Sequence, residues 1–190
     1  YNALMVCLES FKGGLLLLED INKYVSATVS QEVNGAICSN RHSDRDIIIH
    51  YQGVGAPGPA IWRNFNWIRF HQMTEPVNKT SQKGKYEECL QAFSIIEILI
   101  ENAVDAGDQR FHIYFEEGDR KIRGAYSQKM LWNAIIKYIE LNFKSLVTPH
   151  LNKYDYAQNK VIKTDAKTAV QQIASKLFKD LYGGSMPIAA

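Results

Sequence analysis

The segment that most constrains the fold is a run of four leucines, Leu15–Leu18, which follows two glycines and ends on two adjacent carboxylates, Glu19 and Asp20. A short run that is apolar at every position is typical of a strand buried on both faces at the centre of a parallel sheet. A second apolar run, Asp46–Gln52, also ends on polar residues, and apolar residues at helical spacing lie between the two, over Ser30–Asn40. This strand, helix, strand order predicts a parallel α/β sheet with a ligand site at the carboxyl ends of its strands.

Further elements are predicted along the rest of the chain. Glycines and prolines indicate a loop at Gly53–Pro59, and polar residues indicate a linker at Thr74–Lys85. Periodicity predicts helices at Tyr1–Phe11, Ala60–Phe65, Tyr86–Ala106, Gln128–Phe143 and Asp165–Tyr182, a strand at Trp67–His71 and a β-hairpin over Phe111–Gly124. We therefore expect two parts: an α/β core at residues 1–78, and an accessory region at 79–190 that is mostly helical with a β-hairpin.

Composition excludes few function classes. The 190 residues carry a formal net charge of +2 with the two signs interleaved, which neither supports nor excludes nucleic-acid binding. The three cysteines have no CxxC spacing and the five histidines are scattered, so neither a disulfide framework nor a metal site is indicated. Because no apolar run approaches the roughly 18 residues of a spanning helix, we expect no membrane segment and a cytoplasmic protein, in the host cytoplasm if the protein is viral.

The two adjacent carboxylates suggest a specific chemistry. ATP hydrolysis needs one acid to hold hydrated Mg²⁺ and another to orient or deprotonate the attacking water. A buried strand that delivers Glu19 and Asp20 to its exposed end is the Walker B arrangement. An ordinary strand followed by an acidic helix cap has the same pattern, so the motif alone leaves both interpretations open.

Three segments, Leu15–Tyr24, Ser39–Asp46 and Ile47–Gln52, give the chain a family resemblance over about residues 1–75. The region resembles the FtsK/HerA-like branch of P-loop ATPases, which includes phage DNA-packaging ATPases and the zonula-occludens-toxin-like assembly ATPases of filamentous phages. The resemblance implies that residues 1–78 are the second half of a RecA-like P-loop ATPase core, with ATP and Mg²⁺ as cofactors.

The same resemblance assigns roles to three side chains. Glu19 is the Mg²⁺ contact and Asp20 the catalytic carboxylate, both within reach of the metal. The family usually has Asp and then Glu, so the order is reversed here and the two roles stay exchangeable. Gln52 is the sensor that hydrogen-bonds the γ-phosphate or the water, and it contacts the nucleotide together with Glu19. A polar strand end that faces solvent is the alternative for Gln52.

Two arginines, Arg41 and Arg45, flank the turn before the second strand. Related ring motors present an arginine finger there to the nucleotide of the neighbouring subunit, which can raise the rate about 10³- to 10⁵-fold. Arg45 is favoured slightly over Arg41. A surface ion pair with Asp44 or Asp46 is the alternative for either arginine.

The sequence departs from the family in its phosphate-binding loop. Nowhere do residues 1–190 contain Gly-x-x-x-x-Gly-Lys followed by Ser or Thr, and Lys12-Gly13-Gly14 lacks that spacing. We expect the loop to lie upstream of Tyr1, and we expect the 190-residue polypeptide alone not to bind ATP tightly, because it lacks the cradle for the phosphates.

The favoured hypothesis is a subunit of an ATP-driven motor that translocates or packages DNA for a phage or mobile element. It implies double-stranded DNA as substrate, a homo-oligomeric ring, and a portal-like or virion protein as a further partner. A non-catalytic α/β binding or scaffold protein is the alternative, and a nuclease built on Glu19 and Asp20 is a weaker one. The aromatic and cationic run Trp62–Arg69 fits single-strand stacking, although core packing is the commoner use of such a segment.

Overall fold

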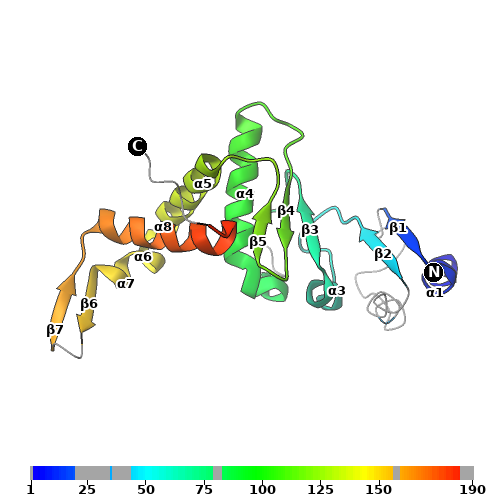
Figure 1. The fold of residues 1–190 in the computed structure, drawn as a ribbon, viewed down its shortest axis with the longest axis horizontal. Helices are drawn as coiled ribbons and strands as arrows, with labels where there is room; N and C mark the ends of the chain where they lie inside the picture. Colours follow the sequence, from blue (N-terminus) through cyan, green and yellow to red (C-terminus); the bar gives the residue numbers. More distant parts are fainter. Residues whose placement is uncertain (1, 20–34, 36–43, 79–82, 156–158, 185–190) are drawn as a thin grey trace. The chain divides into compact units, whose positions relative to one another are not determined.

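The computed structural model describes residues 2–19, 35, 44–78, 83–155 and 159–184. The chain divides into two units (Figure 1), the first made of Tyr1–Phe65 with Met73–Glu88 and the second of Asn66–Gln72 with Cys89–Ala190. Both units contain helices and strands, so the predicted mixed α/β class is confirmed, and its parallel part is a sheet of two strands.

The first unit is built on the parallel strands β1 (Gly14–Leu18) and β2 (Arg45–Ile49). Helix α1 (Asn2–Ser10) precedes β1 and helix α3 (Pro59–Asn64) follows β2. These four elements match the predicted ranges to within a few residues. The predicted helix at Ser30–Asn40 lies outside the described residues except for Gly35, which is helical.

Backbone chemistry explains where α1 ends and β1 begins. Gly13 and Gly14 have φ values of 72° and 88°, which residues with a side chain rarely adopt. The glycine pair therefore turns the chain from α1 into β1. At α3, Pro59 occupies the first turn, where its missing N–H and fixed φ do not disturb the helix.

A small aromatic core closes the first unit around α3. The Trp62 ring lies 4.8 Å from the Tyr86 ring, measured between centroids, and 5.9 Å from that of Phe65. The Tyr86 hydroxyl donates to the Val77 carbonyl at 3.1 Å. Tyr86 itself has non-helical dihedrals inside the 3₁₀ segment η3 (Lys83–Cys89). The helix predicted from Tyr86 therefore begins later than expected.

The second unit contains an antiparallel sheet in the order β3 (Trp67–Phe70), β4 (Ile113–Glu116), β5 (Lys121–Arg123). The predicted hairpin is thus present as β4 and β5. The strand predicted at Trp67–His71 is also present, and it pairs with β4 of the second unit. Helix α4 (Leu90–Asp105) packs on one face of this sheet, where fully buried Phe93 contacts the rings of Phe70 and Phe115 at 4.9 and 5.2 Å.

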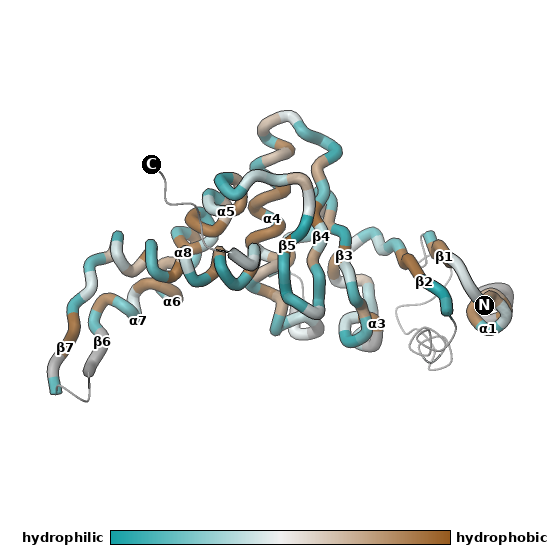
Figure 2. The backbone as a smooth tube through the Cα atoms, viewed as in Figure 1, coloured by the Kyte–Doolittle hydropathy of each residue, from teal (hydrophilic) through white to brown (hydrophobic). Residues whose placement is uncertain are grey.

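Helices α5 (Gln128–Leu141) and α8 (Ala166–Tyr182) complete the core of the second unit. Both have N-caps: Ser127 accepts from the Met130 amide, and Asp165 from the Thr168 amide. The fully buried residues of the two helices include Leu131, Ala134, Ile135, Ile139, Ala174 and Phe178. Figure 2 shows hydrophobic stretches on α4, α5 and α8.

Four short elements between α5 and α8 were not predicted from the sequence. They are α6 (Phe143–Leu146), α7 (Thr148–Leu151) and the antiparallel strands β6 (Asn152–Asp155) and β7 (Lys160–Lys163). None of the helices in the described part of the chain has the length and apolar character needed to span a bilayer.

Candidate functional site

The candidate site lies at the carboxyl edge of the β1–β2 pair. The two strands run in parallel register from Gly14 opposite Arg45 to Leu18 opposite Ile49. One further hydrogen bond, from the His50 amide to the Leu18 carbonyl at 2.9 Å, extends the ladder beyond β2. The two parallel strands therefore end level with each other.

Glu19 and Gln52 both follow this edge. Glu19 comes directly after β1 in a turn, and Gln52 lies three residues beyond β2 in a bend. Both residues are exposed. Tyr51, between His50 and Gln52, is only partly exposed, and burial raises the pKa of its hydroxyl. The described structure thus brings a carboxylate and a carboxamide to the same open edge.

Asp20 and Arg41 lie outside the described residues. Their predicted roles, as catalytic carboxylate and as an alternative arginine finger, stay predictions.

Arg45 is buried and bonds to backbone carbonyls at the end of α1. It is 7% exposed, and its guanidinium Nη1 donates to the carbonyl oxygens of Leu8 and, at 2.9 Å, of Phe11. Leu8 lies in the last turn of α1, where carbonyls lack helical partners and the helix dipole favours a cation. Arg45 therefore caps α1 and ties it to the start of β2.

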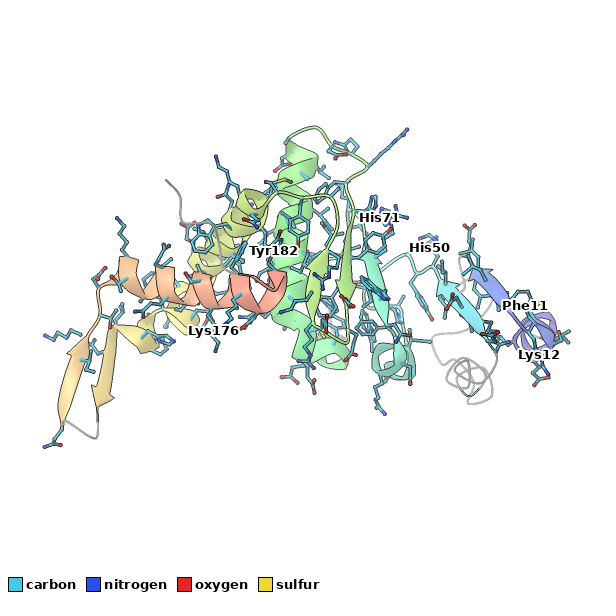
Figure 3. The ribbon with its side chains drawn as sticks, viewed as in Figure 1. Phe11, Lys12, His50, His71, Lys176 and Tyr182 are labelled. Carbon is cyan, nitrogen blue, oxygen red and sulfur yellow. The ribbon has the colours of Figure 1, made fainter. Side chains whose placement is uncertain are left out.

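The location of Arg45 also separates it from the carboxyl edge of its own subunit. Arg45 is the first residue of β2 and Ile49 the last, so four residue steps of about 3.3 Å put roughly 13 Å of strand between them. Figure 3 labels Phe11 at the α1 side and His50 at the other end of β2. In the first unit, buried Arg45 therefore has a structural role. Its predicted action on the nucleotide of a neighbouring subunit stays a prediction.

Glu75 is a residue at this edge that the sequence did not suggest. Its Oε2 atom lies 3.5 Å from the point where a Cβ on Gly53 would stand, so its carboxylate lies against the turn that directly follows Gln52. Glu75 belongs to a segment predicted only as a polar linker. No motif marks it, because its approach to Gly53 depends on the path of the chain after α3.

One face of the β1–β2 pair is exposed and mostly apolar, with Asp46 opposite Leu15 as its charged residue. Leu15, Leu17 and Ile48 are 58%, 53% and 50% exposed, and Leu17 is opposite Ile48 in the register. In Figure 2 β2 runs from a hydrophilic start to a hydrophobic end. Parallel sheets are normally covered on both faces, so this surface is unusual for a finished parallel sheet.

The described residues fit a Mg²⁺–nucleotide site in part. Mg²⁺ keeps several waters and takes one or two protein carboxylates together with phosphate oxygens, and exposed Glu19 offers such a carboxylate. A metal site formed by protein side chains alone is not present in the described part of the chain. Among those residues, no group of three or more His, Cys, Asp or Glu side chains is arranged to hold a metal ion. Glu19 and Gln52 could therefore contribute to a site whose remaining ligands come from the nucleotide.

Comparison of the chain with protein-family models, with curated protein sequences and with solved structures gives no match.

Proposed function

We propose that the chain is part of a Mg²⁺-dependent ATPase of the P-loop class, and that its first unit is the portion of a RecA-like core that follows the phosphate-binding loop. The observation that carries the proposal is the level parallel ending of β1 and β2, with Glu19 and Gln52 exposed at that edge. Ligands of open α/β sheets bind at this edge.

The exposed apolar face of the β1–β2 pair supports the same proposal. A P-loop core has more parallel strands and has helices on both faces of its sheet. Leu15, Leu17 and Ile48 would be the contact surface for those layers, since each is at least half exposed. Full burial of such a side chain contributes roughly 1.5–3 kcal/mol, so covering the exposed half of each would contribute about 1 kcal/mol.

The proposed chemistry assigns one task to each polar side chain. Bound Mg²⁺ would neutralise charge on the phosphates. The Glu19 carboxylate would hold the hydrated ion, Asp20 would orient or deprotonate the attacking water, and the Gln52 amide would hydrogen-bond that water or the γ-phosphate. The reversed order of the two acids leaves the roles of Glu19 and Asp20 to be separated by experiment.

The proposed substrate and assembly follow from the family resemblance. They are double-stranded DNA, moved by a homo-oligomeric ring whose sites are shared between subunits, with a portal-like or virion partner, in the cytoplasm.

The test is ATP turnover by the protein extended upstream of Tyr1 to include the phosphate-binding loop that the proposal requires. We expect turnover that rises with double-stranded DNA and falls by roughly 10²-fold or more in Asp20→Asn, the range for loss of a general base. Glu19→Gln should also abolish turnover. Glu9→Gln, an exposed acid of α1, is the matched control and should leave turnover unchanged.

Two results would refute the proposal. One is an upstream reading frame without a phosphate-binding loop, and the other is turnover that survives both Glu19→Gln and Asp20→Asn. The first result would favour a non-catalytic α/β scaffold, whereas the second would show that Glu19 and Asp20 are not the catalytic acids. The buried hydrogen bonds of Arg45 are the observation that fits this second candidate, because they give a conspicuous arginine a purely structural use.

A further inference from the structure

The open face of the β3–β4–β5 sheet carries aromatic and cationic side chains. Along β3, Phe70 is buried against α4 with Ile68 on the same side, so Trp67 and Arg69 point to the opposite face. Trp67 is 53% exposed. The register places Arg69 opposite Tyr114, so Tyr114 shares this face.

These side chains form a continuous row. The Arg69 guanidinium carbon lies 5.7 Å from the centre of the Tyr114 ring, a cation–π distance. The Tyr114 ring lies 5.6 Å from that of His112, and the His112 ring lies 5.7 Å from that of His71. Figure 3 labels His71 beside the sheet. With Trp67 this row is called the aromatic face.

Three further charged side chains share this face: the register places Glu116 opposite Trp67, Lys121 opposite Glu116, and Arg123 opposite Tyr114. Arg123 Nε pairs with Glu116 at 3.0 Å and its Nη2 with Asp119 at 3.6 Å. Lys121 Nζ donates to the Lys179 and Asp180 carbonyls at the end of α8. In the described part of the chain no carboxylate lies within ion-pair distance of Arg69, so its guanidinium is available to pair with a phosphate.

We propose that the aromatic face binds single-stranded nucleic acid. Flat rings on an open sheet stack on unpaired bases of any sequence, and a nearby arginine contacts the phosphate backbone or stacks as well. A duplex would bind this face less well, because the faces of its bases are already stacked on one another inside the helix. A protein partner fits less well, since the row has two histidines and an arginine where an apolar docking surface would have aliphatic residues.

This inference does not depend on the proposed ATPase function. It rests on the second unit alone, whereas Glu19 and Gln52 belong to the first. Oligonucleotide binding by residues 1–190 needs neither ATP nor an upstream extension, so the two proposals can fail separately.

The test is fluorescence anisotropy of a labelled oligothymidylate titrated with the 190-residue chain at low salt. Trp67→Ala and Tyr114→Ala should each weaken binding about tenfold, within the range for loss of one stacked base. Tyr114→Phe keeps the ring and should bind like the parent protein. The matched control for lost aromatic surface is Phe143→Ala, a residue of α6 that is 38% exposed.

Charge is tested by a second pair of variants. Arg69→Gln should weaken binding and lower the slope of log affinity against log salt by about 0.7, the value for one phosphate contact on a single strand. Lys176→Gln removes the same charge from the exposed surface of α8 and should leave both quantities unchanged. An oligouridylate titrated in parallel distinguishes RNA from DNA as the preferred strand.

Three results would overturn the proposal: no binding of any single strand at low salt, tighter binding of a duplex than of the single strand, or binding that Trp67→Ala and Arg69→Gln leave unchanged. Circular dichroism checks that each variant is folded. Should Tyr114→Ala lose its fold, the exposed positions Trp67 and Arg69 decide the question by themselves.

Discussion

Replacing Arg45 with methionine should destabilise the first unit and leave the second intact. The substitution removes two charge-assisted hydrogen bonds, to the Leu8 and Phe11 carbonyls, each worth about 1.5–3 kcal/mol. Relief from keeping a guanidinium buried offsets part of that loss, because a buried charge is costly to desolvate. We expect a net loss of about 2–3 kcal/mol in the free energy of unfolding.

Urea denaturation measures this loss, and amide hydrogen exchange locates it. With an m-value of about 1–3 kcal/mol/M, the unfolding midpoint should fall by roughly 0.7–3 M. Amides of α1 and β2 should exchange faster, whereas those of α4 in the second unit should not change. Lys12→Met removes an equal charge from an exposed side chain beside Phe11 and is the control (Figure 3). Equal stability of Arg45→Met and Lys12→Met would show that Arg45 does not cap α1.

Two further predictions concern the second unit. Phe93→Ala should lower the free energy of unfolding by about 3–5 kcal/mol, because Phe93 is fully buried between Phe70 and Phe115. Urea titration measures the loss, and a loss no larger than that of the exposed control Phe143→Ala would contradict this packing. Burial raises the pKa of Tyr126, whose hydroxyl donates to the Ile122 carbonyl, to about 12. Because the pKa of Tyr126 is higher in the folded state than the ordinary value of 10.0, this group stabilises the protein fully at pH values below about 10. The free energy of unfolding should therefore fall as pH rises from about 10 to 12. In urea titrations across this range, Tyr126→Phe should make that fall smaller.

Local pattern was sufficient to predict most elements of the fold. Helical spacing identified α1, α5 and α8, and continuous apolar runs identified β1 and β2, with small boundary errors. Residues such as Gly13 and the N-cap Asp165 mark the boundaries of these elements. The β6–β7 hairpin was missed because each strand has only four residues and neither shows an alternation of apolar and polar residues. The pairing of β3 with β4 was missed because it joins segments more than forty positions apart in the sequence.

The candidate site was predictable only where it depends on strand ends. Glu19 and Gln52 could be placed together because the carboxyl ends of parallel strands share an edge. Neither the burial of Arg45 beneath α1 nor the approach of Glu75 to Gly53 follows from any local pattern, because both depend on how separate segments pack.

The run Trp62–Arg69 shows why such a pattern cannot be interpreted as one segment. From its sequence it could be core packing or a stacking surface for nucleic acid, and the structure divides it between the two units after Phe65. Before the division, Trp62 is 9% exposed and packs against Phe65 and Tyr86. After it, Trp67 is more than half exposed on the open side of a strand. Core packing therefore explains the first half of the run, and only the second half has the exposure that base stacking requires.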